Sequence, residues 1–115
     1  MNLITLGEAK NYLRVDSNSD DNLILSLLAS AEKITTDVAR MSAAEWDTIC
    51  DETVEKMTIR DADLQIGEIL KLRDLLRSAV LFSLGYLYEH REEANHHDLM
   101  MTLRNLLSSV REGVF

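Results

Sequence analysis

The segment from Asp16 to Asp20, with the sequence Asp-Ser-Asn-Ser-Asp, places side-chain oxygens at the first, third and fifth positions of a calcium-binding loop. Such a loop also needs glycine at its sixth position, for a sharp turn, and a bidentate glutamate at its twelfth. In this chain those two positions are Asp21 and Leu27. The pattern therefore predicts a polar turn in which Ser19 or Asp20 caps the next helix, and no calcium site.

His90, Glu93 and His97 form a second candidate set, because a helix would bring their side chains toward one face, as a zinc site requires. However, the apolar spacing ends the helix before His97, and no neighbouring side chain would orient the ligands. His96 and His97 are more typical of a solvated turn between two helices. We therefore expect no bound metal.

Cys50 is the single cysteine, and no histidine lies near it in the sequence to act as a base. A structural thiol is the commoner role for such a residue, and one cysteine fits a reducing compartment. Paired carboxylates can act as acid and base, but no glycine-rich phosphate loop or nucleophile–base pair accompanies the acids of this sequence. We expect no catalytic residues, no cofactor and no enzymatic activity.

The 115 residues carry a net charge of −8, and most of it comes from one segment. Between Asp37 and Glu68 there are nine acidic and three basic residues. Sequence-specific nucleic-acid binding needs a basic surface, so we do not expect it here. The longest nearly unbroken apolar run, from Ala79 to Tyr88, is ten residues, well short of the ~20 that cross a bilayer. We expect no membrane association and no signal peptide.

The spacing of apolar residues predicts a single all-α domain over residues 1–115, a small helical bundle. Two long helices are expected at about 20–40 and 68–93, short helices near 6–13 and 43–57, and a C-terminal helix to about 111. Thr5–Glu8 and Ser42–Glu45 are capping boxes, in which a hydroxyl and a carboxylate satisfy the first amides of a helix. Residues 58–67 are predicted to be a loop, and no sheet is expected, because no convincing alternating pattern is present.

The helix predicted at 68–93 is apolar on nearly all sides between Ala79 and Tyr88, so the rest of the chain or neighbouring subunits must cover it. In the helix predicted at 20–40, Glu32, Lys33 and Asp37 are expected to face water. Trp46, the single tryptophan, either packs the middle helix onto the core or anchors a contact with another protein.

Three segments, taken in order, resemble the head–tail connector (adaptor) proteins of long-tailed, siphovirus-type phages. The first is LITLGEAKNYLRVDSNSDDNLI at residues 3–24, which is similar to the opening of that family. The second is the charged end of the long apolar helix, Tyr88-Glu89-His90-Arg91-Glu92. The third is LRNLLSSVREGVF at residues 103–115, which resembles the family's closing Leu-Leu-x-x-x-Arg.

The resemblance implies an all-α protomer that assembles with itself into a ring of about a dozen copies beneath the portal protein. Such a ring extends the DNA channel and docks a tail-completion or head-closure protein. It belongs to the head–tail junction of a virion made in the host bacterial cytoplasm.

The resemblance also implies that a set of charged and aromatic residues contributes to the interface between subunits: Arg14, Asp16, Tyr88, Glu89, Arg91 and Glu92. The residues alone leave plainer roles open. Arg14 and Asp16 fit a local salt bridge, and the residues after Tyr88 fit the amphipathic end of a helix.

A different class of function is also compatible with the composition. The acidic segment from Asp37 to Glu68 would suit a small helical binding module, such as a DNA mimic or the partner of a transcription regulator. Such a module would be monomeric or dimeric and would bind a basic protein at low salt. A connector would instead form rings or bind a portal, so the oligomeric state as a function of concentration separates the two classes.

Overall fold

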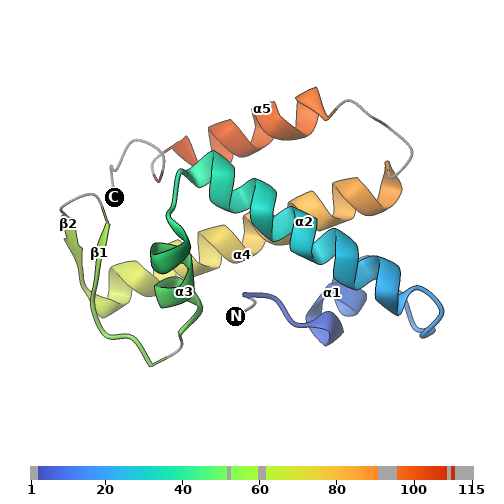
Figure 1. Cartoon of the computed structure of the whole chain (residues 1–115), viewed down its shortest axis with the longest axis horizontal. Coiled ribbons are helices and arrows are strands. Elements are labelled where there is room, and N and C mark those ends of the chain that lie inside the picture. Colours follow the sequence, from blue (N-terminus) through green and yellow to red (C-terminus); the bar gives the residue numbers. More distant parts are fainter. Residues whose placement is uncertain (1–2, 52, 60–61, 91–95, 109, 111–115) are drawn as a thin grey trace.

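The computed structural model describes residues 3–51, 53–59, 62–90, 96–108 and 110 (Figure 1). The elements follow one another as α1 (Leu6–Leu13), α2 (Asp21–Ala39), α3 (Ala43–Cys50), β1 (Met57–Ile59), β2 (Ala62–Leu64), α4 (Ile66–Glu89) and α5 (His97–Leu106). The chain is therefore mostly helical, and the predicted all-α bundle with two long helices is confirmed.

The central element is α4, which contacts α1, α2, α3 and α5. In Figure 1, α2 crosses α4, α5 runs along the outer side of α2, and α3 lies near the first half of α4. The hairpin of β1 and β2 sits at the end of the molecule where α4 begins (Figure 1). The long helix α2 and the shorter helices α1, α3 and α5 thus supply the cover that the apolar sequence of α4 requires.

Both predicted capping boxes are present. Thr5 Oγ1 accepts a hydrogen bond from the Glu8 amide at 3.1 Å, and the Glu8 carboxylate accepts from the Thr5 amide at 3.3 Å. Ser42 and Glu45 make the same reciprocal pair at 3.1 and 2.9 Å. These local bonds explain why the beginnings of α1 and α3 are readable from the sequence.

The prediction of a loop without any strand at residues 58–67 was wrong. β1 and β2 pair antiparallel, with Met57 opposite Leu64 and Thr58 opposite Asp63, and α4 already begins at Ile66. Met57 and Leu64 are buried together, while Thr58 Oγ1 donates to Asp63 Oδ1 at 2.8 Å on the exposed face. With three residues in each strand, the alternation is too short to stand out in the sequence.

The middle helix, predicted at 43–57, ends earlier, at Cys50. Arg73 of α4 donates from Nε to the Ile49 carbonyl at 2.8 Å and from an Nη to the Asp51 carbonyl at 2.7 Å. These carbonyls belong to the end of α3, where backbone acceptors lack helical partners. A charged side chain from α4 therefore satisfies carbonyls at the end of α3 and ties that end to the central helix.

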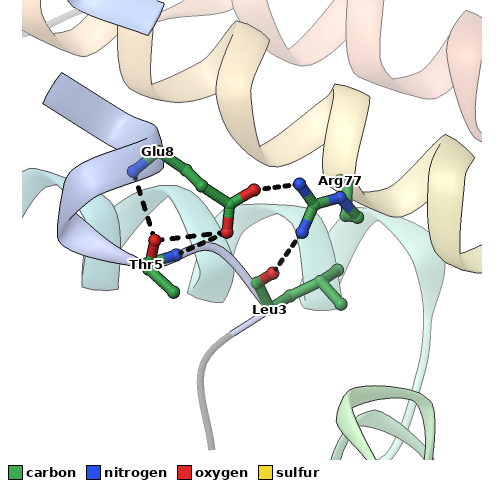
Figure 2. A network of polar contacts seen from close by, with 4 residues as sticks. All are labelled: Leu3, Thr5, Glu8 and Arg77. Atoms are coloured by element: carbon green, nitrogen blue, oxygen red, sulfur yellow. Dashed lines mark hydrogen bonds and ion pairs between the residues drawn. The ribbon is translucent and has the colours of Figure 1, made fainter. Parts of the chain in front are cut away.

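Arg77 performs a similar task at the N-terminal segment (Figure 2). Its guanidinium donates to the Leu3 carbonyl at 2.9 Å and forms an ion pair with the Glu8 carboxylate. The hydrogen bond from Arg77 holds the pKa of the Glu8 carboxyl below its ordinary value. Leu3 and Ile4 are buried beneath this network, so the polar contacts at the surface fix an apolar anchor below.

The buried face of α4 consists of residues spaced three and four apart: Ile69, Leu72, Leu76, Ala79, Val80, Ser83, Leu84 and Leu87. Ser83 is satisfied within the helix, because its hydroxyl donates to the Ala79 carbonyl at 2.8 Å. On other faces of the same helix, Ile66, Leu70 and Phe82 remain exposed. The cover over α4 is therefore extensive but incomplete.

Leu84→Asp should unfold the protomer, because Leu84 is 0% exposed and the substitution buries an unpaired carboxylate, at a cost of several kcal/mol. The matched control is Leu70→Asp in the same helix, where the leucine is 49% exposed. We expect this variant to melt within a few degrees of the parent. Thermal melts followed by circular dichroism compare the two variants. Equal melting temperatures would show that Leu84 does not belong to the core of the protein.

Candidate functional site

An open groove of about 490 Å³ runs between the end of α1 and the second half of α4. We call it the α1–α4 groove; its lining residues are Tyr12, Leu13, Arg14, Phe82, Gly85, Tyr86, Tyr88 and Glu89. Tyr12 is 49% exposed and Phe82 is 39% exposed, so two aromatic side chains line the groove without being covered. Aromatic and arginine side chains of this kind are enriched in protein–protein interfaces.

Two features of the local structure shape this groove. Gly85 lets the Tyr12 ring approach α4, since a Cβ added there would lie 3.1 Å from Tyr12 Cε2. Tyr88 Oη donates to Asp20 Oδ2 at 3.1 Å, which connects the end of α4 to the residue just before α2. The ion pair of Lys10 with Asp21, at 2.8 Å, holds α1 against the same helix start. The groove is thus fixed by contacts among three helices.

The structure brings together three of the residues that the resemblance implicates. Arg14, Tyr88 and Glu89 come from distant parts of the sequence and line the same groove. Asp16 lies in the exposed turn after α1 and is not part of the lining. Arg91 and Glu92 lie outside the described residues. Tyr12 and Phe82, which line the groove, were not among the predicted site residues. The sequence did carry a signal for Phe82, because this residue lies off the main apolar stripe of α4.

Arg14 has an unusual backbone conformation. It ends α1 in the left-handed region, with φ 59° and ψ 43°, and its amide donates to the Asn11 and Lys10 carbonyls. Arg40 ends α2 in the same way, with φ 58°. Glycine is the usual residue at such helix ends. Both arginine side chains are exposed, and neither has an ion pair within the part of the chain that the structure describes.

The calcium-like turn does not assemble ligands. Asn18 Oδ1 accepts from Lys10 Nζ at 2.9 Å, the Ser17 and Ser19 hydroxyls share a 2.9 Å hydrogen bond, and Asp20 accepts from Tyr88. Asp20 is the residue before α2, as predicted, but its side chain makes no capping bond. These oxygens therefore serve the turn and its neighbours.

Two of the three histidines, His90 and His96, lie against Tyr86 near the end of α4. His90 stacks on the Tyr86 ring at a centroid distance of 4.4 Å, and His96 meets its edge at 5.8 Å. Glu93, the third member of the candidate zinc set, lies outside the described residues. Among the residues that are described, no group of three or more His, Cys, Asp or Glu side chains is placed to hold a metal ion.

The prediction that Glu32 faces water was wrong. This residue is 8% exposed, and its Oε1 has no hydrogen-bond partner in the described structure. Burial raises the pKa of the Glu32 carboxyl above its ordinary value, while hydrogen bonding to the Leu3 backbone and the Trp46 side chain opposes that shift. Lys33 and Asp37 are exposed as expected and form an ion pair at 2.8 Å.

Cys50 and Trp46 lie in the same buried region, each 7% exposed. Burial, together with the nearby Glu32 charge, raises the pKa of the Cys50 thiol to about 11. At neutral pH such a thiol is not a nucleophile. Trp46 packs into the core, which supports the first of its two predicted roles.

Comparison with known proteins found no match to this chain among family models, curated proteins or solved structures. None of the helices that the structure describes combines the length and the apolar character needed to cross a membrane.

Gly67→Ala and Gly85→Ala should have different effects on stability. A Cβ at Gly67 meets nothing within 4 Å, so alanine should raise the free energy of unfolding by about 0.5–1 kcal/mol. At Gly85 the same Cβ presses on the Tyr12 ring at 3.1 Å, which should cancel the gain or reverse it. Urea unfolding measures both changes, and an equal gain at the two positions would mean that Tyr12 does not pack on Gly85.

Glu32→Gln should stabilise the protein at neutral pH and give a higher melting temperature by several degrees. A raised folded-state pKa means that stability present at low pH is lost as the pH rises through that pKa, and glutamine removes this loss. The gap between variant and parent should therefore narrow on acidification.

The control for this pH series is Glu8→Gln, for which the sign is opposite. The pKa of Glu8 is lowered, so its contribution is present at neutral pH and lost as the pH falls through the folded-state value. This variant should be less stable than the parent at pH 7, and the difference should vanish in acid. Melting curves across the acid-to-neutral range decide both cases; a Glu32→Gln difference independent of pH would show that the carboxyl titrates normally.

Proposed function

We propose that this chain is the head–tail connector of a tailed phage or prophage, a structural protein that acts through repeated contacts between subunits. The observation that carries the proposal is the α1–α4 groove. Arg14, Tyr88 and Glu89 were singled out by the resemblance, and they line one surface together with half-exposed aromatic side chains. A surface with aromatic anchors and charges at its edge suits a specific protein contact.

In this proposal the copies form a ring of about a dozen beneath the portal protein, through a heterologous interface that joins different faces of neighbouring subunits. The ring extends the DNA channel and presents a docking surface to a tail-completion or head-closure protein. The excess of acidic residues suits a channel, because negative charge repels the phosphates of the genome and keeps it from adhering.

The second candidate is the small acidic binding module. Its supporting observation is the set of exposed carboxylates on α3 and on the hairpin, such as Asp47 and Asp63. Several acids of this region already have local partners, however: Asp37 pairs with Lys33, Glu45 completes a capping box, and Asp63 accepts from Thr58. Carboxylates engaged in this way are less suited to imitate a row of DNA phosphates, so we favour the connector.

Charge reversal at the groove should weaken assembly. Arg14→Glu combined with Glu89→Lys should weaken the contact between copies, and with it ring assembly on the portal encoded in the same genome, at least tenfold, since like charges would face their former partners. Helix content and melting should stay close to the parent, because both side chains are exposed. Sedimentation of the mixed proteins and electron microscopy of the product measure the effect.

Arg40→Glu is the matched control for this experiment. It reverses an exposed arginine with the same left-handed backbone at the end of a helix, but away from the α1–α4 groove. This variant should assemble as the parent does. If the parent neither binds the portal nor forms rings, the connector proposal fails; binding to a basic regulatory protein at low salt would support the acidic module.

A further inference from the structure

A hollow of about 430 Å³ lies between the second half of α2 and the first turns of α3. We call it the α2–α3 pocket. Figure 1 shows the chain passing from the end of α2 directly to α3, so the pocket lies near the junction of these two helices. Its lining is apolar at Met41, Ala43 and Trp46 and polar at Glu32 and Thr36. Among the described residues, the pocket and the α1–α4 groove share no lining side chain.

Glu32 is the lining residue that most needs a partner. Only 8% of its surface is exposed, and its Oε1 has no hydrogen-bond partner in the described structure. Burial raises the pKa of this carboxyl, although hydrogen bonding to the Leu3 backbone and the Trp46 side chain and, most weakly, the charge of the amino terminus act in the opposite direction. A buried carboxylate oxygen without a donor is costly, and such atoms in folded proteins normally have a ligand, an ion or water beside them. Because Glu32 lines the α2–α3 pocket, a donor that enters the pocket approaches this carboxylate.

The charges that line the pocket favour a cation. Three carboxylates, those of Glu32, Asp37 and Asp47, face the pocket together with the single ammonium group of Lys33. Lys33 is already paired with Asp37 at 2.8 Å. Asp47 is exposed and has no ion pair within the part of the chain that the structure describes. The lining therefore has an excess of negative charge even after its own cation is counted.

The charged residues just outside the lining do not change this balance. Arg40 follows the end of α2 and is exposed, and Glu45 completes the capping box of α3, so they add one charge of each sign. A metal ion is not the expected occupant, because no described group of three or more His, Cys, Asp or Glu side chains is placed to hold one. The pocket is thus suited to an organic cation.

An arginine side chain matches the shape and the charge of this pocket. Its aliphatic stem can lie against Met41 and Ala43 while its guanidinium donates to Glu32. Guanidinium groups are more weakly hydrated than ammonium groups and stack on aromatic faces. Arginine therefore suits a buried carboxylate beside Trp46 better than lysine does.

We infer that the α2–α3 pocket binds an arginine side chain presented by a basic partner protein. Glu32 accepts from the guanidinium, Trp46 packs against it, and Asp47 attracts it toward the pocket. The partner is a basic protein rather than a second copy, because this chain carries a net charge of −8 and the pocket borders its acidic segment from Asp37 to Glu68. The inference is independent of the connector proposal, since it concerns a different surface.

Fluorescence of Trp46 measures binding directly, because it is the single tryptophan of the chain. The probe is N-acetyl-arginine methylamide. N-acetyl-norleucine methylamide is the uncharged comparison, and N-acetyl-lysine methylamide replaces the guanidinium with an ammonium group. We expect a saturable change in Trp46 emission with the arginine probe, a weaker response to the lysine probe and none to the norleucine probe at the same concentrations.

Glu32→Gln keeps the size of the side chain and removes its charge, so the dissociation constant of the arginine probe should rise by about tenfold or more. The matched control is Glu89→Gln, which removes the same charge from an exposed position at the α1–α4 groove and should bind the probe like the parent. Asp47→Asn should have a smaller effect than Glu32→Gln, because Asp47 is exposed.

Amide chemical shifts provide a second measurement that does not depend on the emission of Trp46. The arginine probe should shift amides of residues 32–37 and 43–47, which line the pocket from α2 and α3. Shifts confined to other segments would overturn the inference. No saturable response in either measurement would also overturn it and would mean that water alone satisfies Glu32.

The remaining outcomes test the charge and the source of the arginine. Equal binding of the norleucine probe, or equal weakening by Glu32→Gln and Glu89→Gln, would show that Glu32 does not recognise a cation. Loss of self-association in Glu32→Gln, measured by light scattering after size exclusion, would place the arginine on a second copy and reject the basic partner. Each of these results leaves the connector proposal to be decided by portal binding.

Discussion

The cover over α4 is the constraint on which the rest of this fold depends. Its 24 residues are apolar on several faces, and a helix of that kind is stable in water only when other elements pack around it. α2 crosses it, while α1, α3 and α5 contact it from further directions (Figure 1). The two arginines of the helix then secure the covering pieces, Arg73 at the end of α3 and Arg77 at the N-terminal segment (Figure 2).

The candidate interface is a consequence of the way in which this cover ends. α1 has only eight residues, so it cannot follow α4 along its length. Tyr12 lies against Gly85 but is itself 49% exposed, and Phe82, one turn earlier in α4, is 39% exposed. At the other end of α4 the hairpin packs through Met57 and Leu64 but leaves Ile66 and Leu70 exposed. The same incomplete cover thus leaves apolar side chains exposed toward both ends of α4.

The sequence predicted what depends on neighbouring residues. Helix starts follow from Thr5–Glu8 and Ser42–Glu45, whose bonds span three residues. Prediction from the sequence failed where contacts between distant segments determine the position of a residue. Glu32 was assigned to the solvent face, but the N-terminal segment and α3 widen the buried arc of α2 around it. Likewise, the positions of Arg14 and Glu89 on one groove depend on how α1 meets α4, and no local pattern encodes that crossing.

The buried thiol gives this protein an internal reporter of its own motions. With its pKa raised to about 11 and little exposed surface, Cys50 should react with alkylating reagents only when α3 separates from the core. The alkylation rate would then measure how often that region opens, independently of the global unfolding transition. Arg73 ties the end of α3 to α4. The same alkylation rate would therefore show whether a structural change at the far end of α4 weakens the contact between α3 and α4.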